Sequence, residues 1–140
     1  MADGKFMALA RFPVGAWMFQ ALLPAKPGKT PDNPRFAMTE LMKLERAATV
    51  WIAENVAISK ETVRFLRSQA GLTQAALAEL LDVDARTVAR WEAGETVIDR
   101  ARFDALARLA LEHGEGDETT LSRLRAEPVQ RLGEIDLKVA

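Results

Sequence analysis

The chain has 140 residues, a formal net charge of −1, no cysteine and one histidine. The length fits one domain with appendages, and the absence of cysteine excludes a zinc ribbon, a disulfide framework and a thiol nucleophile. Because the net charge is close to zero, any DNA binding must come from locally placed Arg and Lys rather than from bulk attraction. No apolar run is long enough to span a membrane, so we expect a cytoplasmic protein.

Residues 1–33 are predicted to be an apolar segment that ends in a linker. The apolar stretch 12–25 loosely imitates a signal peptide, but Pro13 and Gln20 interrupt it and no clear cleavage site follows. Pro and Gly mark residues 25–31 as linker. The aromatic side chains of this segment either bind a partner or cover the next domain; they are Phe6, Phe12, Trp17 and Phe19.

A helical extension is predicted over residues 34–57, with a helix from 33 to 55. Asn33 is suited to cap a helix, and Pro34 suits the first helical position because its missing N–H costs nothing there. Apolar residues recur at helical spacing as far as Trp51 and Ile52. We expect this helix or the C-terminal region to contact a second copy or a partner, with Trp51 either in the core or at a dimer contact.

Residues 58–113 are predicted to form a compact set of capped helices. Gly71 and Gly94 are placed to end two of them in a left-handed conformation. The residues expected to cap helices are Ser59, Thr73, Asp84 and Asp99. Two short helices, one ending at Leu81 and the next capped by Asp84, are separated by about three residues, which is the spacing of a helix-turn-helix.

The second of these short helices has a face suited to the DNA major groove. Arg86 and Arg90 are four residues apart and share the face opposite Val88. Ala85 and Ala89 lie beside them, and their short side chains keep this face of the helix shallow. Two guanidinium forks on a low face match the acceptors of guanine. The alternative is an ordinary solvated helix face.

The run Leu-Thr-Gln-Ala-Ala-Leu-Ala-Glu-Leu-Leu-Asp-Val-Asp-Ala-Arg-Thr-Val-Ala-Arg-Trp-Glu-Ala-Gly, residues 72–94, resembles the lambdoid phage repressor and Cro family, also called XRE-type. The resemblance covers about residues 59–112 and is closest to antitoxin-like small regulators. It implies that Thr73 and Gln74 hold a phosphate and that Arg67 and Glu92 form a structural ion pair. It also implies that residues of the second helix face bases and the neighbouring backbone, the full predicted DNA-binding set being Thr73, Gln74, Asp84, Ala85, Arg86, Thr87 and Arg90.

Two features depart from the family pattern. Asp82 occupies the turn position usually held by glycine, where a left-handed backbone costs a non-glycine residue ~1–2 kcal/mol. Residues 71–98 also contain only two Arg against five acids. Phosphate neutralisation must therefore draw on flanking cations, namely Lys60, Arg64, Arg100 and Arg102.

The sequence therefore predicts an all-α, lambda-repressor-like helix-turn-helix bundle of about five helices. An N-terminal helical extension precedes it, and a C-terminal helix and tail occupy residues 114–140. The predicted function is a sequence-specific transcriptional repressor that binds an inverted-repeat, double-stranded DNA operator as a homodimer. An antitoxin that binds a toxin protein and represses its own operon is a special case. The alternative is a protein-interaction adaptor without DNA. We predict no enzyme, cofactor or metal, because no catalytic set, phosphate loop or metal cluster is evident.

Overall fold

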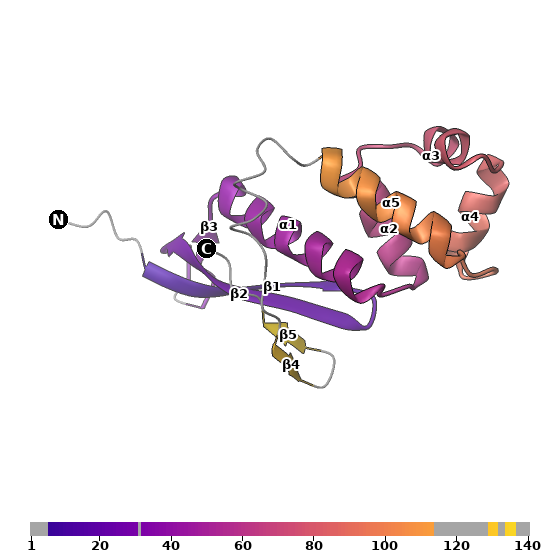
Figure 1. Ribbon diagram of the computed structural model, residues 1–140. Helices are drawn as coiled ribbons and strands as arrows, with labels where there is room; N and C mark the ends of the chain where they lie inside the picture. The colour runs from indigo at the N-terminus through magenta and orange to yellow at the C-terminus, as the bar shows by residue number, and fades with distance from the viewer. Residues whose placement is uncertain (1–5, 31, 114–128, 132–133, 137–140) are drawn as a thin grey trace.

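The computed structural model describes residues 6–30, 32–113, 129–131 and 134–136. In these residues a β-sheet lies along one side of α1 (Met38–Asn55), and the remaining helices pack beyond α1 (Figure 1). The helices α3 and α4 lie at the end farthest from the sheet. None of the described helices is long and apolar enough to cross a membrane.

The first described residues form a β-hairpin, so the all-α prediction was wrong. Strands β1 (Phe6–Val14) and β2 (Trp17–Lys26) pair antiparallel, and the two-residue turn between them contains Gly15 at φ 59°. Alternate residues of β2, such as Phe19 and Leu23, are buried against the helices, whereas Leu22 on the other face is 61% exposed. Because both faces are apolar in sequence, the two-residue period of a half-buried strand was hidden.

Three short strands extend the hairpin into a sheet. The strand β3 (Arg35–Phe36) pairs with the end of β2, which runs through part of the expected linker. The strands β4 (Val129–Arg131) and β5 (Glu134–Asp136) pair with each other, and β5 pairs parallel with β2. Part of the C-terminal tail therefore joins the chain's own sheet. The helix expected near residues 118–126 lies outside the described residues.

Helix α1 begins at Met38, four residues after Pro34, the predicted first helical position, because Arg35 and Phe36 are used in β3. Its N-cap is Ala37, which makes no side-chain capping bond, so the prediction that Asn33 caps this helix was wrong. Its end at Asn55 was predicted correctly, and Val56 adopts a left-handed conformation there. The side chain of Trp51 is 4% exposed and its ring centroid lies 5.6 Å from that of Phe19. Trp51 therefore belongs to the core rather than to a contact with a second copy or a partner.

The other helices begin and end close to their predicted positions: α2 (Lys60–Gln69), α3 (Gln74–Leu81), α4 (Ala85–Ala93) and α5 (Arg100–His113). Ser59, Thr73 and Asp84 each accept a hydrogen bond from a backbone N–H in the first turn of the helix that follows. Asp99 does the same for α5 through the N–H of Arg102. The predicted caps of α2 to α5 are confirmed.

One continuous hydrophobic core joins the sheet to the helices. It includes Phe19 and Leu23 of the hairpin together with Leu66 of α2 and Phe103 of α5. The ring of Phe12 stacks near that of Phe19 and also lies 5.7 Å from that of Phe65 on α2. The hairpin aromatics Phe12 and Phe19 thus cover the helical domain.

A buried arginine also ties α1 to α5. Arg46, 7% exposed, donates to the carbonyl of Ala110 at 3.2 Å and to the carbonyl of Leu111. These carbonyls belong to the last turn of α5, where no intrahelical N–H follows to satisfy them. A cation at this end also opposes the negative pole of the helix dipole. Arg46 therefore fixes the orientation of α1 relative to α5.

Candidate nucleic-acid interface

The helices α3 and α4 form a rigid pair joined by Asp82, Val83 and Asp84. Leu77 and Ala78 of α3 and Val88 of α4 are at most 2% exposed and belong to the shared core. Asp82 has φ 57° and ψ 45°, so the left-handed turn expected at this position is confirmed. Because the inner faces interlock, the outer face of α4 is held in one orientation.

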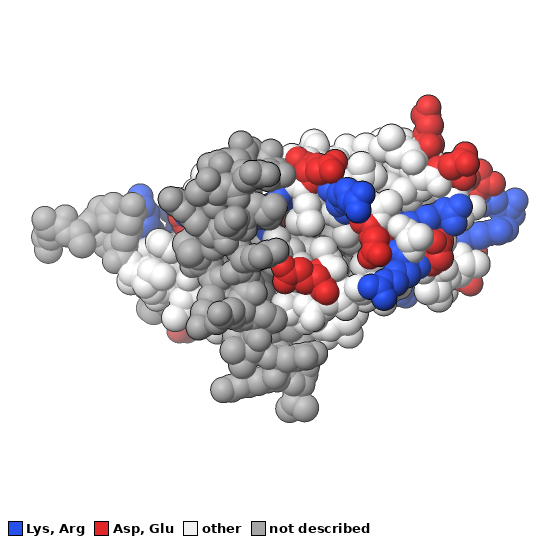
Figure 2. Space-filling view, in the orientation of Figure 1, with Lys and Arg blue, Asp and Glu red and all other residues white. Residues whose placement is uncertain are grey.

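The outer face of α4 carries the residues predicted to meet DNA. Ala85, Arg86 and Arg90 are exposed, and Thr87 and Ala89 are half-buried. Trp91 and Glu92, on the other side, are buried. Figure 1 places α4 at the end of the molecule away from the sheet, and Figure 2 shows blue and red side chains interleaved over that end. The face is therefore accessible and mixed in charge.

Asp84 and Thr87 are engaged with each other at the start of α4. The backbone N–H and the hydroxyl of Thr87 donate to Asp84 Oδ1 at 2.8 and 2.7 Å. These hydrogen bonds from Thr87 lower the pKa of the Asp84 carboxyl, and the charges of Arg90 and Arg86 add to the effect. The cap stays ionised at neutral pH and fixes where the recognition face begins.

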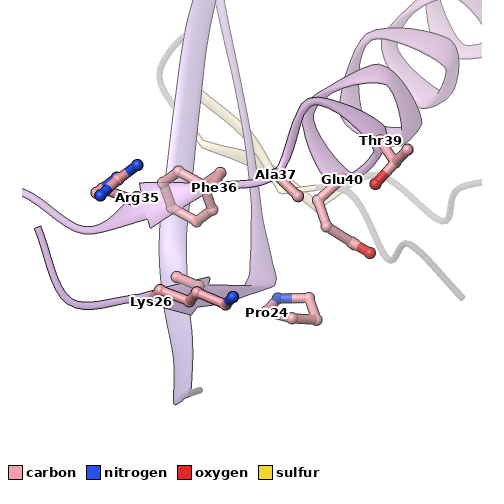
Figure 3. A pocket seen from close by; sticks show the side chains of 8 residues that line it. Pro24, Lys26, Arg35, Phe36, Ala37, Thr39 and Glu40 are labelled. Atoms are coloured by element: carbon pink, nitrogen blue, oxygen red, sulfur yellow. The ribbon is translucent and has the colours of Figure 1, made fainter. Parts of the chain in front are cut away.

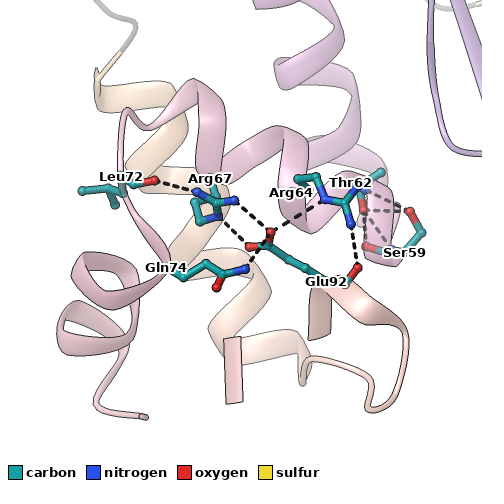
Figure 4. Close-up of polar contacts among 7 residues, drawn as sticks. All are labelled: Ser59, Thr62, Arg64, Arg67, Leu72, Gln74 and Glu92. Carbon is teal, nitrogen blue, oxygen red and sulfur yellow. Dashed lines mark hydrogen bonds and ion pairs between the residues drawn. The ribbon is translucent and has the colours of Figure 1, made fainter. Parts of the chain in front are cut away.

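Arg67 and Glu92 come together beneath this face, joining α2 to α4 (Figure 4). Arg67 donates from Nε to Glu92 Oε2 at 2.6 Å and from Nη2 to Oε1 at 2.9 Å. Arg67 Nη1 also donates to the carbonyl of Leu72 at 3.0 Å. The hydrogen bond with Glu92 raises the pKa of Arg67. Two parallel bonds of this kind fix both distance and orientation.

Two further residues complete the cluster around Glu92. Gln74 Nε2 donates to Glu92 Oε1 at 3.3 Å, so the side-chain amide points inward. Arg64 donates from Nη2 to the backbone carbonyl of Glu92 at 3.0 Å, a contact that the sequence does not predict. Thr73 is used as the cap of α3, accepting from the N–H of Ala76 at 3.1 Å. The first backbone N–H groups of α3, which no intrahelical carbonyl accepts, remain suited to a phosphate.

The comparisons with known proteins agree with this geometry. Residues 61–118 match a family model described as a helix-turn-helix domain. This part of the chain is a helix-turn-helix domain. The match is consistent with the XRE-type resemblance of the sequence and suggests a DNA-binding regulator, while the β1–β2 hairpin and α1 lie outside it. No curated protein and no solved structure gives a match.

Most of the described arginines near the recognition face of the helix-turn-helix domain already have acidic neighbours. Arg90 Nε lies 3.8 Å from Glu95 Oε2, and Arg100 Nε lies 3.7 Å from Asp104 Oδ2. Arg102 Nη1 donates to Asp99 at 3.1 Å, which lowers the pKa of that carboxyl. Exposed pairs of this kind are weak, so phosphates can compete with the carboxylates for the arginines.

A cavity outside the helix-turn-helix domain lies between the end of β2, the strand β3 and the start of α1 (Figure 3). Its volume is about 500 Å³, and Lys26, Arg35, Phe36 and Glu40 contribute to its lining. Lys26 and Arg35 are register partners in the β2–β3 pair. Among the described residues no three His, Cys, Asp or Glu side chains gather as metal ligands.

Proposed function

We propose that the chain is a sequence-specific DNA-binding transcriptional regulator that acts as a repressor. The observation that carries the proposal is the exposed face of α4, with Arg86 and Arg90 on a rigid helix-turn-helix. An arginine fork matches the two acceptors on a guanine edge, and a good bidentate pair discriminates by ~1–3 kcal/mol. The N-terminus of α3 then takes a phosphate and sets the register on the duplex.

A homodimer is part of the proposal. One helix-turn-helix with few free cations grips DNA weakly, whereas two copies bind two half-sites. The buried middle of α1 leaves no broad free face on that helix for the second copy. The support comes instead from apolar side chains that are 43% or more exposed near the hairpin and the start of α1: Phe6, Met7, Leu9, Leu22, Met38 and Met42. The operator of such a dimer is an inverted repeat with half-site centres ~34–36 Å apart, or a multiple of that distance.

An antitoxin that represses its own operon is the special case of this function. Its support is the resemblance of residues 72–94 and the presence of N-terminal elements, residues 6–55, that lie outside the matched residues 61–118. In this case the N-terminal residues before position 56 or the C-terminal tail engage the toxin protein.

A protein-interaction adaptor is the second candidate, and one observation favours it. Arg90, Arg100 and Arg102 each lie within 4 Å of an acidic side chain, so the surface is less cationic than its arginine content suggests. An adaptor does not have to bind phosphate, so these arginines can stay paired with their acidic neighbours while it functions.

Selection from a random duplex library separates the two candidates. The purified full-length chain is mixed with random duplexes at low salt, and bound DNA is amplified and sequenced over several rounds. A regulator enriches one motif, arranged as an inverted repeat, and binds it with an affinity that falls as salt rises. An adaptor enriches no motif, and that outcome would reject the proposed function.

A further inference from the structure

Glu95 is fixed beside Arg90 by the way in which α4 ends. Gly94 has φ 78°, its N–H donates to the carbonyl of Trp91 at 3.2 Å, and the N–H of Glu95 donates to the carbonyl of Arg90 at 3.0 Å. These two bonds are those of a Schellman motif, which turns the chain back across the last helical turn. The backbone therefore places Glu95 next to Arg90, within reach of its side chain.

The side chains meet across this turn. Glu95 Oε2 lies 3.8 Å from Arg90 Nε, and the side chains are 65% and 45% exposed. The other carboxylate that acts on Arg90, that of Asp84, is held by two hydrogen bonds from Thr87. Glu95 is thus the acid in salt-bridge range of Arg90, and both side chains are open to a ligand on the recognition face.

We propose that Glu95 is a specificity-determining residue that withholds Arg90 from the phosphate backbone of non-cognate DNA. The inference rests on the proposed function, because it assumes that Arg90 reads a base. On a wrong sequence, Arg90 has a choice between one exposed carboxylate and one exposed phosphate, and these are interactions of the same weak kind. On the correct sequence, a bidentate guanine contact has better geometry than either and draws Arg90 away from Glu95.

A consequence for salt dependence follows. Non-specific binding is governed by the number of phosphates that the protein neutralises, and each one adds about 0.9 to the slope of log K against log salt. With Glu95 present, Arg90 divides its time between the carboxylate and a phosphate, so on non-cognate DNA it counts only in part among these contacts. Removing the carboxylate frees Arg90 to neutralise one more phosphate there, but leaves its contact on cognate DNA unchanged. Glu95 therefore lowers the affinity for non-cognate DNA more than it lowers the affinity for the operator.

The test uses the full-length chain and three variants, titrated over a salt series against the duplex found by selection and a scrambled duplex. Glu95→Gln removes the carboxylate. Glu40→Gln is the matched control, because it removes the same charge from an ion pair with Lys43 on α1, outside the helix-turn-helix domain. The double variant Glu95→Gln with Arg90→Ala asks whether the effect passes through Arg90.

For Glu95→Gln we expect the slope on scrambled DNA to steepen by up to about 0.9 and the ratio of cognate to scrambled affinity at low salt to fall by up to about tenfold, with the cognate slope unchanged. Glu40→Gln should leave both slopes as they are, and the Arg90→Ala background should abolish the change. The inference is overturned if Glu95→Gln leaves the scrambled slope unchanged, if Glu40→Gln has the same effect, or if the effect survives without Arg90. If the unaltered chain distinguishes the two duplexes, such a result rejects the role of Glu95 alone. If it binds neither, the proposed function fails and this inference with it.

Discussion

Replacing Glu92 with Gln tests how the recognition helix is held. The carboxylate of Glu92 is 4% exposed and accepts two charge-assisted hydrogen bonds from Arg67, whose side chain is 21% exposed. A neutral amide keeps the shape of the side chain but leaves the Arg67 guanidinium without a counter-charge. It also turns an N–H₂ group toward Arg67 or Gln74, both of which now donate to Glu92.

The size of the loss follows from this burial. Breaking a fully buried ion pair costs ~3–5 kcal/mol, but the partial exposure of Arg67 lets water reach the stranded cation, so we expect about 2–3 kcal/mol. For a chain of this size that loss lowers the melting temperature by roughly 6–12 °C.

The assay is thermal unfolding followed by circular dichroism, with Glu95→Gln as the matched control. Glu95 lies just past the end of α4 and also pairs with an arginine, but it is 65% exposed. Its replacement should change stability by less than about 0.5 kcal/mol, because exposed pairs contribute little. If Glu92→Gln melts within 2 °C of the unaltered chain, roughly 0.5 kcal/mol, the cluster around Glu92 does not hold α4 and the reasoning is refuted.

Three further predictions concern other parts of the molecule. Arg46→Met keeps the aliphatic packing but removes the donors to the last carbonyls of α5, and we expect chemical denaturation to show a loss of about 1–3 kcal/mol; unchanged stability would contradict the anchoring role. The double variant Leu9→Asp, Leu22→Asp should be a monomer in light scattering where the unaltered chain is a dimer, because both side chains are at least 43% exposed on the hairpin. An unaltered chain that is already a monomer would reject that interface. The pKa of the Asp84 carboxyl, followed by NMR, should lie below the ordinary value of 3.8. The cap then stabilises the folded chain at pH values above 3.8, and this stabilisation is lost as the pH falls through the lowered pKa. A carboxyl with a pKa at or above 3.8 would disprove the hydrogen-bonded cap.

Local signals made the helical domain predictable from sequence. Ser59, Thr73 and Asp84 are capping residues followed by apolar residues at helical spacing, and Gly71 and Gly94 supply left-handed ends at φ 68° and 78°. Each of these signals acts within one or two turns of the chain, so it survives without knowledge of the tertiary structure.

The hairpin was missed because its own signals conflict. Leu22 and Met7 are apolar on the exposed face, so the strands lack the alternation of apolar and polar residues that marks a half-buried sheet. Pro13 and Gln20 interrupt the apolar run in the sequence, although Pro13 fits β1 because β1 is an edge strand. The turn at Gly15 was the one local indication of a hairpin, since glycine takes a positive φ without strain.

The contacts that position the site depend on distant pairings. Arg46 meets the end of α5 across 64 residues, and Arg64 meets the carbonyl of Glu92 across 28. No local pattern indicates which carbonyl a long side chain will reach. The Arg67–Glu92 pair was expected only because the family resemblance implied it, and the structure brings the two side chains together.

The most direct test of the central claim is whether the arginines of α4 read base sequence. The unaltered chain, Arg86→Ala, Arg90→Ala and Gln74→Ala are titrated against cognate and scrambled duplexes at one fixed salt concentration. Loss of a bidentate guanine contact should weaken cognate binding by ~1–3 kcal/mol, so Arg90→Ala should lower the ratio of cognate to scrambled affinity by roughly fivefold to 150-fold. Gln74→Ala should weaken both duplexes about equally, because its side chain is bonded to Glu92 and helps to hold α3, whose end sets position rather than reading a base. If Arg86→Ala and Arg90→Ala both leave the ratio unchanged, this face does not read DNA and the adaptor function takes its place.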